Sequence, residues 1–145
     1  MSAIAERRRH RAFHWEDFRP AQSFALGGCR LSSEDIIGFA TAYDPQVSHV
    51  DTEAAKTTFL GGLAASGWHS CAVLMRLLHN ALLWRTAYIG MPRIDAIRWQ
   101  APLRPDQTIA GHTKCLARRE IADRPDWGIC EFQVEAVDEL GRSIA

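Results

Sequence analysis

Apolar residues in the middle of the chain recur with helical spacing and predict one long helix. From Leu63 to about Arg85 they fall on nearly every side of that helix, and such a helix is buried on most sides. Four polar or charged residues interrupt the run: His69, Arg76, His79 and Asn80. The run therefore predicts a core helix rather than a membrane span. It is expected to begin directly after Gly61-Gly62.

Alternation of apolar and polar residues predicts strands on both sides of this helix. The segment Ser23–Leu31 is predicted as the first strand, with a bulge or bend at its glycines. After the helix, strands are expected over Arg93–Ala101, Gln107–Arg118 and Trp127–Val137. A final strand has barely begun at Ala145, which leaves little to complete a sheet. We therefore expect pairing with a second subunit.

A shorter helix is predicted between the first strand and the long helix. Ser32 or Ser33 caps its start, and Pro45 ends it near Asp44 because the residue before a proline avoids the α conformation. A loop then runs to Asp51, and a short helix is expected after it. Helices followed by antiparallel strands form an α+β pattern. Residues 13–145 are expected to form one domain, and residues 1–12 a flexible basic tail.

Composition and charge narrow the range of functions. The 145 residues fit one domain, and the formal net charge of zero argues against a dedicated nucleic-acid binder. The four cysteines lie far apart without a CxxC pair, which gives zinc-ribbon or thioredoxin chemistry no support. The arginine-rich start is not followed by the apolar stretch of a signal peptide. A cytoplasmic protein without a membrane segment is expected.

Asp44 and His49 are the first candidates for chemistry. They lie five residues apart and bracket a loop that starts with a proline, and a loop lets both side chains converge on one point. A carboxylate and an imidazole that share one water molecule can act as a general acid–base pair. The alternative is structural: the aspartate caps the next turn and the histidine is partly exposed. His49 and Asp51 lack further ligands at suitable spacing, so no metal site is expected.

The glycine pair Gly61-Gly62 is the second candidate. At the start of the predicted helix, backbone N–H groups without a nearby side chain can bind a carbonyl oxygen that gains negative charge. The alternative is that the glycines only permit close packing or a tight turn.

Three sequence blocks, in this order, resemble the MaoC-like dehydratases, which include the (R)-specific enoyl-CoA hydratases. The blocks are FATAYDPQVSHVDTEAA (39–55), FLGGLAASGWHS (59–70) and RWQAPLRPDQT (98–108). The resemblance extends from about Trp15 to the end of the chain. It implies a hotdog fold, in which a curved antiparallel sheet wraps a long central helix. The activity it implies is reversible addition of water across the double bond of a 2-enoyl thioester, with no metal or redox cofactor and a CoA-type thioester as substrate.

The resemblance also implies roles for particular residues. Asp44 would activate the water, and His49 would help to hold it and manage the proton delivered to the α-carbon. The N–H of Gly62 would bind the thioester oxygen. Five further residues are expected to bind substrate or support the site: Gln46, Asp51, Gly61, Ser66 and Ser70. Asp51 is expected to support the loop, and Ser66 and Ser70 are rival matches for a serine of the family.

The chain departs from the family pattern at three places. The motif usually has Asn-Pro where this chain has Gln46 and Val47, the residue before Gly62 is often His rather than Gly61, and a later Gly-Asp turn is replaced by Asp106-Gln107. These changes leave Asp44 and His49 intact, but they indicate a divergent branch.

Three functions remain open at this point. A hydratase or dehydratase is the leading hypothesis, and a non-catalytic acyl-thioester-binding or assembly subunit is the alternative that the altered loop suggests. Thioester hydrolysis on the same fold is disfavoured, because the predicted long helix contains no Asp or Glu. A homodimer or higher homo-oligomer is expected, with no nucleic acid or membrane as partner. Six arginines suit the phosphates of a CoA-type carrier, with ordinary surface charge as the alternative: Arg93, Arg98, Arg104, Arg118, Arg119 and Arg124.

Overall fold

The computed structural model describes residues 12–145, so nearly all of the expected basic tail lies outside the described residues. The short elements are η1 (Trp15–Asp17), α3 (Val47–Val50), η2 (Ala54–Thr57) and η3 (Leu83–Arg85). The larger ones are β1 (Ser23–Arg30), α2 (Ser33–Tyr43), α4 (Gly67–Ala81), β2 (Thr108–Ile121) and β3 (Arg124–Val137).

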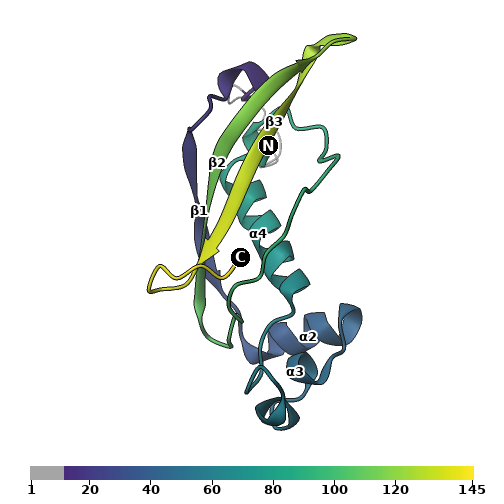
Figure 1. The fold of residues 1–145 in the computed structure, drawn as a ribbon, viewed down its shortest axis with the longest axis vertical. Helices are drawn as coiled ribbons and strands as arrows, with labels where there is room; N and C mark the ends of the chain where they lie inside the picture. The colour runs from purple at the N-terminus through teal and green to yellow at the C-terminus, as the bar shows by residue number, and fades with distance from the viewer. Residues whose placement is uncertain (1–11) are drawn as a thin grey trace, which may run out of the picture.

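The three strands form one antiparallel sheet in the order β1-β2-β3, and α4 lies along one face of it (Figure 1). The ladder between β1 and β2 shifts register between Ala25 and Gly27, where Gly27 adopts a φ of 77° that glycine tolerates at little cost. The expected glycine bulge in the first strand is therefore confirmed. So is the α+β arrangement of a long helix against a curved antiparallel sheet.

The shorter helix, α2, begins and ends where the sequence predicts. Ser32 is its N-cap: the side chain of Ser32 accepts a hydrogen bond from the Asp35 N–H, and the Asp35 carboxylate accepts one from the Ser32 N–H. The helix ends at Asp44, directly before Pro45, and the Asp44 N–H still bonds to Ala40. The cap and the proline together fix where the side chain of Asp44 leaves the helix.

The prediction of a loop between Asp44 and Asp51 is wrong in one respect, because this segment contains the single-turn helix α3. Gln46 is the N-cap of this turn, and the N–H of His49 bonds to its carbonyl at 2.8 Å. The short helix expected afterwards is the 3-10 turn η2. Helical geometry from Val47 to Val50 points His49 inward, where only 8% of it is exposed.

The long helix begins four residues later than predicted, at Gly67 instead of Leu63. The residues before it are extended, and their backbone N–H groups bond to other parts of the chain instead of continuing α4: the N–H of Ala64 bonds to Ser48 of α3 and that of Ala65 bonds to Leu103. The helix also ends at Ala81, and the rest of the predicted span is the separate turn η3. Consequently Gly61-Gly62 does not lie at the helix N-terminus.

The prediction of a strand over Arg93–Ala101 is also wrong, since residues 87–107 form no regular helix or strand. The segment still follows the sheet, and the N–H of Gln100 bonds to the carbonyl of Ile144 at 2.8 Å. Trp99 packs on the first turn of α4 so closely that a Cβ on Gly67 would lie 2.6 Å from its indole ring. Side-chain packing on α4 and main-chain hydrogen bonds from Gln100 and Ala101 to Ile144 thus position a segment that the apolar pattern assigned to a sheet.

Two buried clusters lie between α4 and the sheet. The larger one joins Leu74 of α4 and Ile36 of α2 to Ile109 of β2, and the smaller one joins Leu82 to Phe18 and Cys115 at the other end. The helix is not buried on most sides as predicted: Trp68 is 57% exposed in this single chain.

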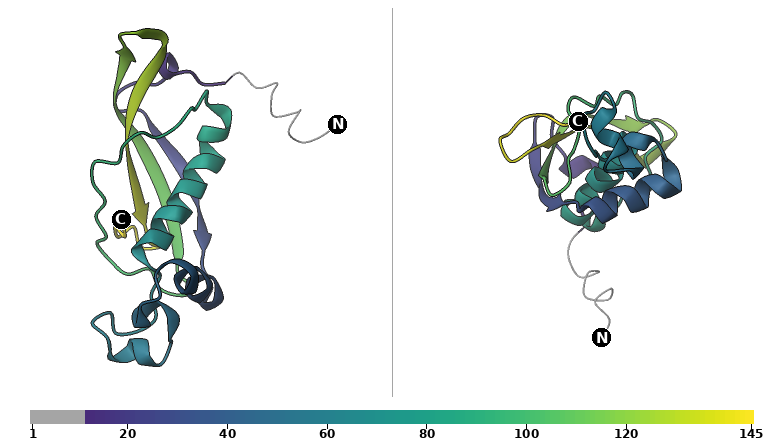
Figure 2. Two further views of the ribbon diagram at one scale, coloured as in Figure 1. Left: turned by 90° about the vertical axis from the view of Figure 1, so that its right-hand side faces the viewer. Right: turned by 90° about the horizontal axis from the view of Figure 1, so that it is seen from below.

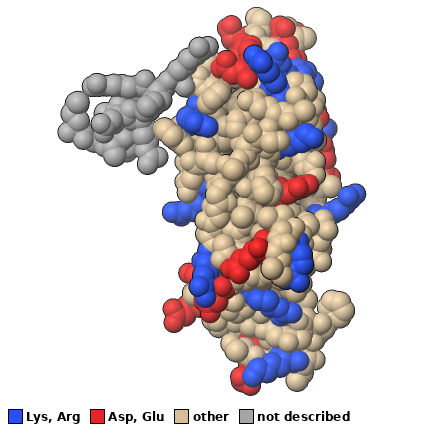
Figure 3. Space-filling model, turned by 90° about the vertical axis from the view of Figure 1, so that its left-hand side faces the viewer, with Lys and Arg blue, Asp and Glu red and all other residues tan. Residues whose placement is uncertain are grey.

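Acidic and basic side chains are interspersed over the face shown in Figure 3. This distribution agrees with the net charge of zero, and it shows no continuous basic patch on that face. Across residues 12–145, none of the helices has the length and apolar character needed to cross a membrane.

The burial pattern of β2 can be tested by truncating one buried and one exposed side chain. Ile109 is fully buried beneath α4, whereas Leu116 of the same strand is 49% exposed. Ile109→Ala is expected to lower the free energy of unfolding by about 2–5 kcal/mol, because it leaves a cavity in the core. Leu116→Ala is expected to lower it by at most about 1 kcal/mol. Urea denaturation of both variants measures the difference, and equal losses would contradict this packing.

Candidate active site

Asp44, His49 and the start of α4 meet at one end of the molecule, where α2 and α3 gather beside the sheet (Figures 1 and 2). Asp44 comes from the end of α2 and His49 from α3. Both side chains are largely shielded, with 19% of Asp44 and 10% of His49 exposed. The structure therefore brings together the two residues that the sequence singled out.

Two hydrogen bonds hold the carboxylate of Asp44. The hydroxyl of Ser66 donates to Oδ2 at 2.6 Å, and the amide Nε2 of Gln46 donates to Oδ1 at 2.8 Å. These bonds, that of Ser66 first, lower the pKa of Asp44 below its ordinary value of 3.8 because they stabilise the charged form. Asp44 is therefore an ionised carboxylate at neutral pH.

Ser66 has a second role as the N-cap of α4. Its Oγ accepts a hydrogen bond from the Trp68 N–H at 3.2 Å while donating its own proton to Asp44. No part of Ser66 is exposed, so no solvent competes for these bonds. The arrangement places the negative charge of Asp44 at the positive end of the helix dipole, which favours the ionised form.

A backbone carbonyl fixes the orientation of His49. Its Nδ1 lies 2.7 Å from the oxygen of Ala64, and since a carbonyl only accepts, Nδ1 carries a proton. In the neutral ring the other nitrogen, Nε2, then has a free lone pair. That nitrogen faces Asp44 Oδ2 at 3.8 Å, too long for a direct hydrogen bond.

The glycine pair lies on the extended segment that leads into α4. Arg104 donates to the carbonyls of Leu60, Gly62 and Leu63, with NH1 2.7 Å from Gly62 and 3.2 Å from Leu63. From the sequence, Arg104 is predicted only to be a phosphate ligand or a surface charge. Nothing local in the sequence indicates this contact, because its acceptors are main-chain oxygens more than 40 residues away.

The remaining predicted residues lie around this centre. Asp51 accepts hydrogen bonds from the N–H groups of Glu53 and Ala54, so it caps the turn η2. Ser70 is buried one turn beyond Ser66 on α4. The serine that contacts Asp44 is thus Ser66, while Ser70 lies deeper along the helix. Within residues 12–145, no group of three or more His, Cys, Asp and Glu side chains is arranged to hold a metal ion.

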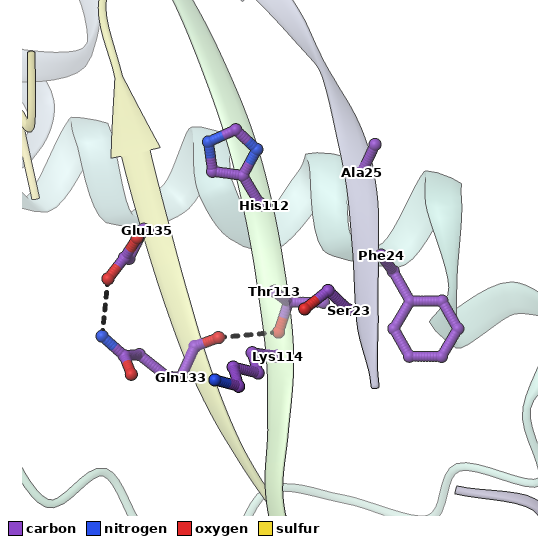
Figure 4. Close-up of a pocket in the computed structure, with 8 residues that line it drawn as sticks. All are labelled: Ser23, Phe24, Ala25, His112, Thr113, Lys114, Gln133 and Glu135. Atoms are coloured by element: carbon purple, nitrogen blue, oxygen red, sulfur yellow. Dashed lines mark hydrogen bonds between the residues drawn. The ribbon is translucent and has the colours of Figure 1, made fainter. Parts of the chain in front are cut away.

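A pocket of about 360 Å³ lies elsewhere, on the sheet. Figure 4 shows its polar lining, which includes His112 and Lys114 of β2 and Gln133 and Glu135 of β3. These β2 side chains alternate with buried neighbours such as Thr113 and therefore point away from α4. The pocket contains none of the residues around Asp44.

Comparisons with known proteins identify the family and the fold of the chain. The sequence model of the family described as MaoC like domain matches residues 17–127. The chain is similar to a solved MaoC-like dehydratase from Rhodospirillum rubrum, with 31% identity, a TM-score of 0.79 and coverage of 92% of this chain and 90% of the other.

Two further solved structures share the fold at lower identity. One is a monoamine oxidase regulatory protein from Archaeoglobus fulgidus, with 19% identity, a TM-score of 0.83 and coverage of 92% and 88% of the two chains. The other is the (R)-hydratase PhaJ1 from Pseudomonas aeruginosa, with 15% identity, a TM-score of 0.68 and coverage of 92% and 80%. The hotdog fold expected from the sequence is confirmed, and the chain belongs to the MaoC-like domain family.

Proposed function

We propose that this chain is a hydratase or dehydratase that adds water reversibly across the double bond of a 2-enoyl thioester of the CoA type. The observation that carries the proposal is the pairing of an ionised Asp44 with a His49 ring whose tautomer is fixed by Ala64. The family membership and the (R)-hydratase among the structures of the same fold support it.

The proposal places one water molecule in contact with both side chains. The separation of 3.8 Å between Asp44 Oδ2 and His49 Nε2 lets a single water contact both atoms at about 2.8 Å. Such a water can donate one proton to each acceptor, which leaves its oxygen lone pairs directed at the β-carbon of a bound substrate.

The hydrogen bonds on Asp44 change the roles that we propose for Asp44 and His49 from those expected from the sequence. Because Ser66 and Gln46 lower its pKa, Asp44 is a weak base that orients the water and stabilises positive charge on the imidazole. We assign the proton acceptor to His49 Nε2. As the water oxygen bonds to the β-carbon, its proton moves to Nε2, and the imidazolium then delivers a proton to the α-carbon, so that H and OH are added overall.

The thioester oxygen gains negative charge during this addition and needs a donor. The N–H of Gly62 is the proposed one. Within residues 12–145 it has no hydrogen-bond acceptor, while the carbonyl of the same residue is bound by Arg104. A donor held in place before the reaction stabilises the developing charge without reorganisation. The helix N-terminus expected to supply this donor is replaced by an extended segment.

We also propose that the chain works as a homodimer or higher homo-oligomer. Large apolar side chains are exposed at the start of α4 and in the irregular segment after it, including Trp68, Ile94 and Trp99, and the rings of Trp68 and Trp99 contact each other. A contiguous exposed apolar surface commonly marks an interface. A cytoplasmic location, expected from the sequence, stays a prediction.

Substitution of either member of the pair tests the reaction. Asp44→Asn and His49→Ala are each expected to lower kcat by about a hundredfold or more, because each removes one contact to the attacking water. The measurement is the loss of enoyl absorbance with a panel of trans-2-enoyl-CoA substrates of different chain length. Asp106→Asn and His79→Ala are matched controls, since both residues are exposed and lie outside the site.

Rates of Asp44→Asn equal to those of the parent would contradict the mechanism. Binding of the substrates without turnover by the folded parent protein would favour the alternative, a non-catalytic acyl-thioester-binding subunit.

Ser66→Ala tests the electrostatics of the site. Removal of the hydroxyl is expected to raise the pKa of Asp44 toward 3.8, as followed by carboxyl NMR titration. A lowered pKa in the folded state adds stability above pH 3.8 that disappears as the pH falls through the folded value. The variant should therefore lose more stability at neutral pH than in acid, and the lost helix cap adds about 1 kcal/mol at any pH. Ser70→Ala, on the same helix, should leave the pKa of Asp44 unchanged.

Sedimentation velocity tests the oligomer. The parent protein is expected to sediment as a dimer or larger assembly, and Trp68→Glu is expected to weaken it because the carboxylate would be buried at an apolar interface. Leu116→Glu, which places the same charge on β2, serves as the control. A parent protein that stays monomeric at micromolar concentrations would contradict the proposal.

A further inference from the structure

The glycine loop before α4 needs a restraint that its own side chains cannot provide. Gly61 and Gly62 adopt φ values of 66° and 151°, a region that other residues rarely enter. A Cβ added at Gly61 would have no neighbour within 4 Å, so packing does not hold this residue. Two successive glycines are the most mobile dipeptide a chain can contain, yet the proposed oxygen donor is the N–H of the second.

Arg104 supplies a restraint from outside the loop. Its NH1 donates to the carbonyls of Gly62 and Leu63, and its NH2 donates to that of Leu60. A guanidinium forms charge-assisted hydrogen bonds that are stronger than those between neutral groups, and its planar fork can span several acceptors at once. Both terminal nitrogens are therefore occupied by the main chain, which disfavours Arg104 as a phosphate ligand.

These contacts bracket the peptide that carries the proposed donor. The carbonyls of Leu60 and Gly62 belong to the peptides directly before and after the one that joins Gly61 to Gly62. Because each peptide is planar, holding the oxygens of both flanking peptides restrains the Cα atoms of Gly61 and Gly62 at the two ends of the peptide between them. The N–H of Gly62 is thereby kept near one position, although its own peptide can still rotate about the line that joins these two Cα atoms.

The same contacts extend to His49. Arg104 binds the carbonyl of Leu63, and in the next peptide the carbonyl of Ala64 accepts the hydrogen bond from His49 Nδ1. The N–H of Ala64 bonds to Ser48, the residue before the imidazole, at 3.1 Å. Arg104 is thus one peptide away from the group that fixes the tautomer of His49.

We propose that Arg104 is a positioning residue of the candidate active site: by holding the carbonyls of residues 60, 62 and 63, it fixes both the Gly62 N–H and the ring of His49. The inference rests on the proposed hydratase reaction for its effect on rate, whereas the restraint itself concerns only the loop.

Arg104→Ala tests the effect on rate. A displaced donor or imidazole affects the transition state more than substrate binding, so kcat is expected to fall by about a hundredfold while KM changes by about twofold or less. Guanidinium ion at millimolar concentration should restore part of kcat by occupying the vacated position. Arg104→Lys should remain impaired and should not respond to guanidinium, because an ammonium group cannot span three carbonyls. Arg30→Ala, which removes an exposed arginine paired with Asp106, is the matched control and should retain the parent kcat.

A second measurement does not depend on turnover. The chain has ten glycines, so selective ¹⁵N-glycine labelling gives a simple NMR spectrum in which Gly61 and Gly62 can be assigned. In Arg104→Ala both amide signals are expected to shift and broaden, and to recover with guanidinium, while distant glycines stay unchanged. If Arg104→Ala does not fold, Arg104→Lys takes its place, with lower kcat and shifted Gly61 and Gly62 signals expected.

Parent-like Gly61 and Gly62 signals in the folded variant would overturn the inference, as would a parent-like kcat. A loss of kcat that guanidinium does not relieve in folded Arg104→Ala would also overturn it. If the parent protein turns over no enoyl thioester, the proposed function fails instead, and the glycine signals alone decide whether Arg104 restrains the loop.

Discussion

The hydrogen bonding of one extended segment, residues 62–66, is the constraint on which the site depends. The segment itself belongs to no helix or strand, yet its buried main-chain groups must be paired. They are paired with Arg104, Ser48, His49 and Leu103, which belong to parts of the chain far apart in sequence. Satisfying the backbone of this segment therefore assembles the site at the same time.

The sheet has a simpler role, because it provides a surface on which these parts can meet. Leu74 of α4 and Ile109 of β2 pack in the same cluster as Leu63, which lies within the extended segment, and Leu103, which lies beside it. Burial of apolar surface on α4 thus also brings Leu103 next to Ala65, where the two form a main-chain hydrogen bond of 2.8 Å. Core and site share residues, so packing of the core determines the geometry of the site.

Local signals in the sequence predicted the elements that depend on local physics. The cap at Ser32 and the proline after Asp44 set the ends of α2, and the glycines set the bulge of β1. The start of α4 was predicted wrongly because Leu63, Ala64 and Ala65 continue the apolar run, although they bond outside the helix. Ser66 directly before Gly67 was the available signal, since serine is a preferred N-cap.

The candidate site, too, could be predicted from the sequence only in part. The spacing of Asp44 and His49 indicated that they meet, but their partners leave little mark on the sequence. The acceptor for His49 is a backbone carbonyl, which any residue could provide, and the donor to Asp44 comes from Ser66, 22 positions away. Arg104 looked like one surface cation among six because its partners are also carbonyls. Contacts to the main chain are specified by the fold as a whole and not by any one side chain.

Ser66 joins two properties that are usually selected separately. Its single hydroxyl oxygen caps α4 and binds the carboxylate of Asp44. One residue therefore determines both the stability of the helix start and the ionisation of the carboxylate. A substitution that improved one would in general spoil the other, which limits the evolutionary routes open at this position. Threonine keeps the hydroxyl, but it would add a methyl group where the serine has no exposed surface. Relatives that diverge in substrate should therefore vary around Ser66 rather than at it.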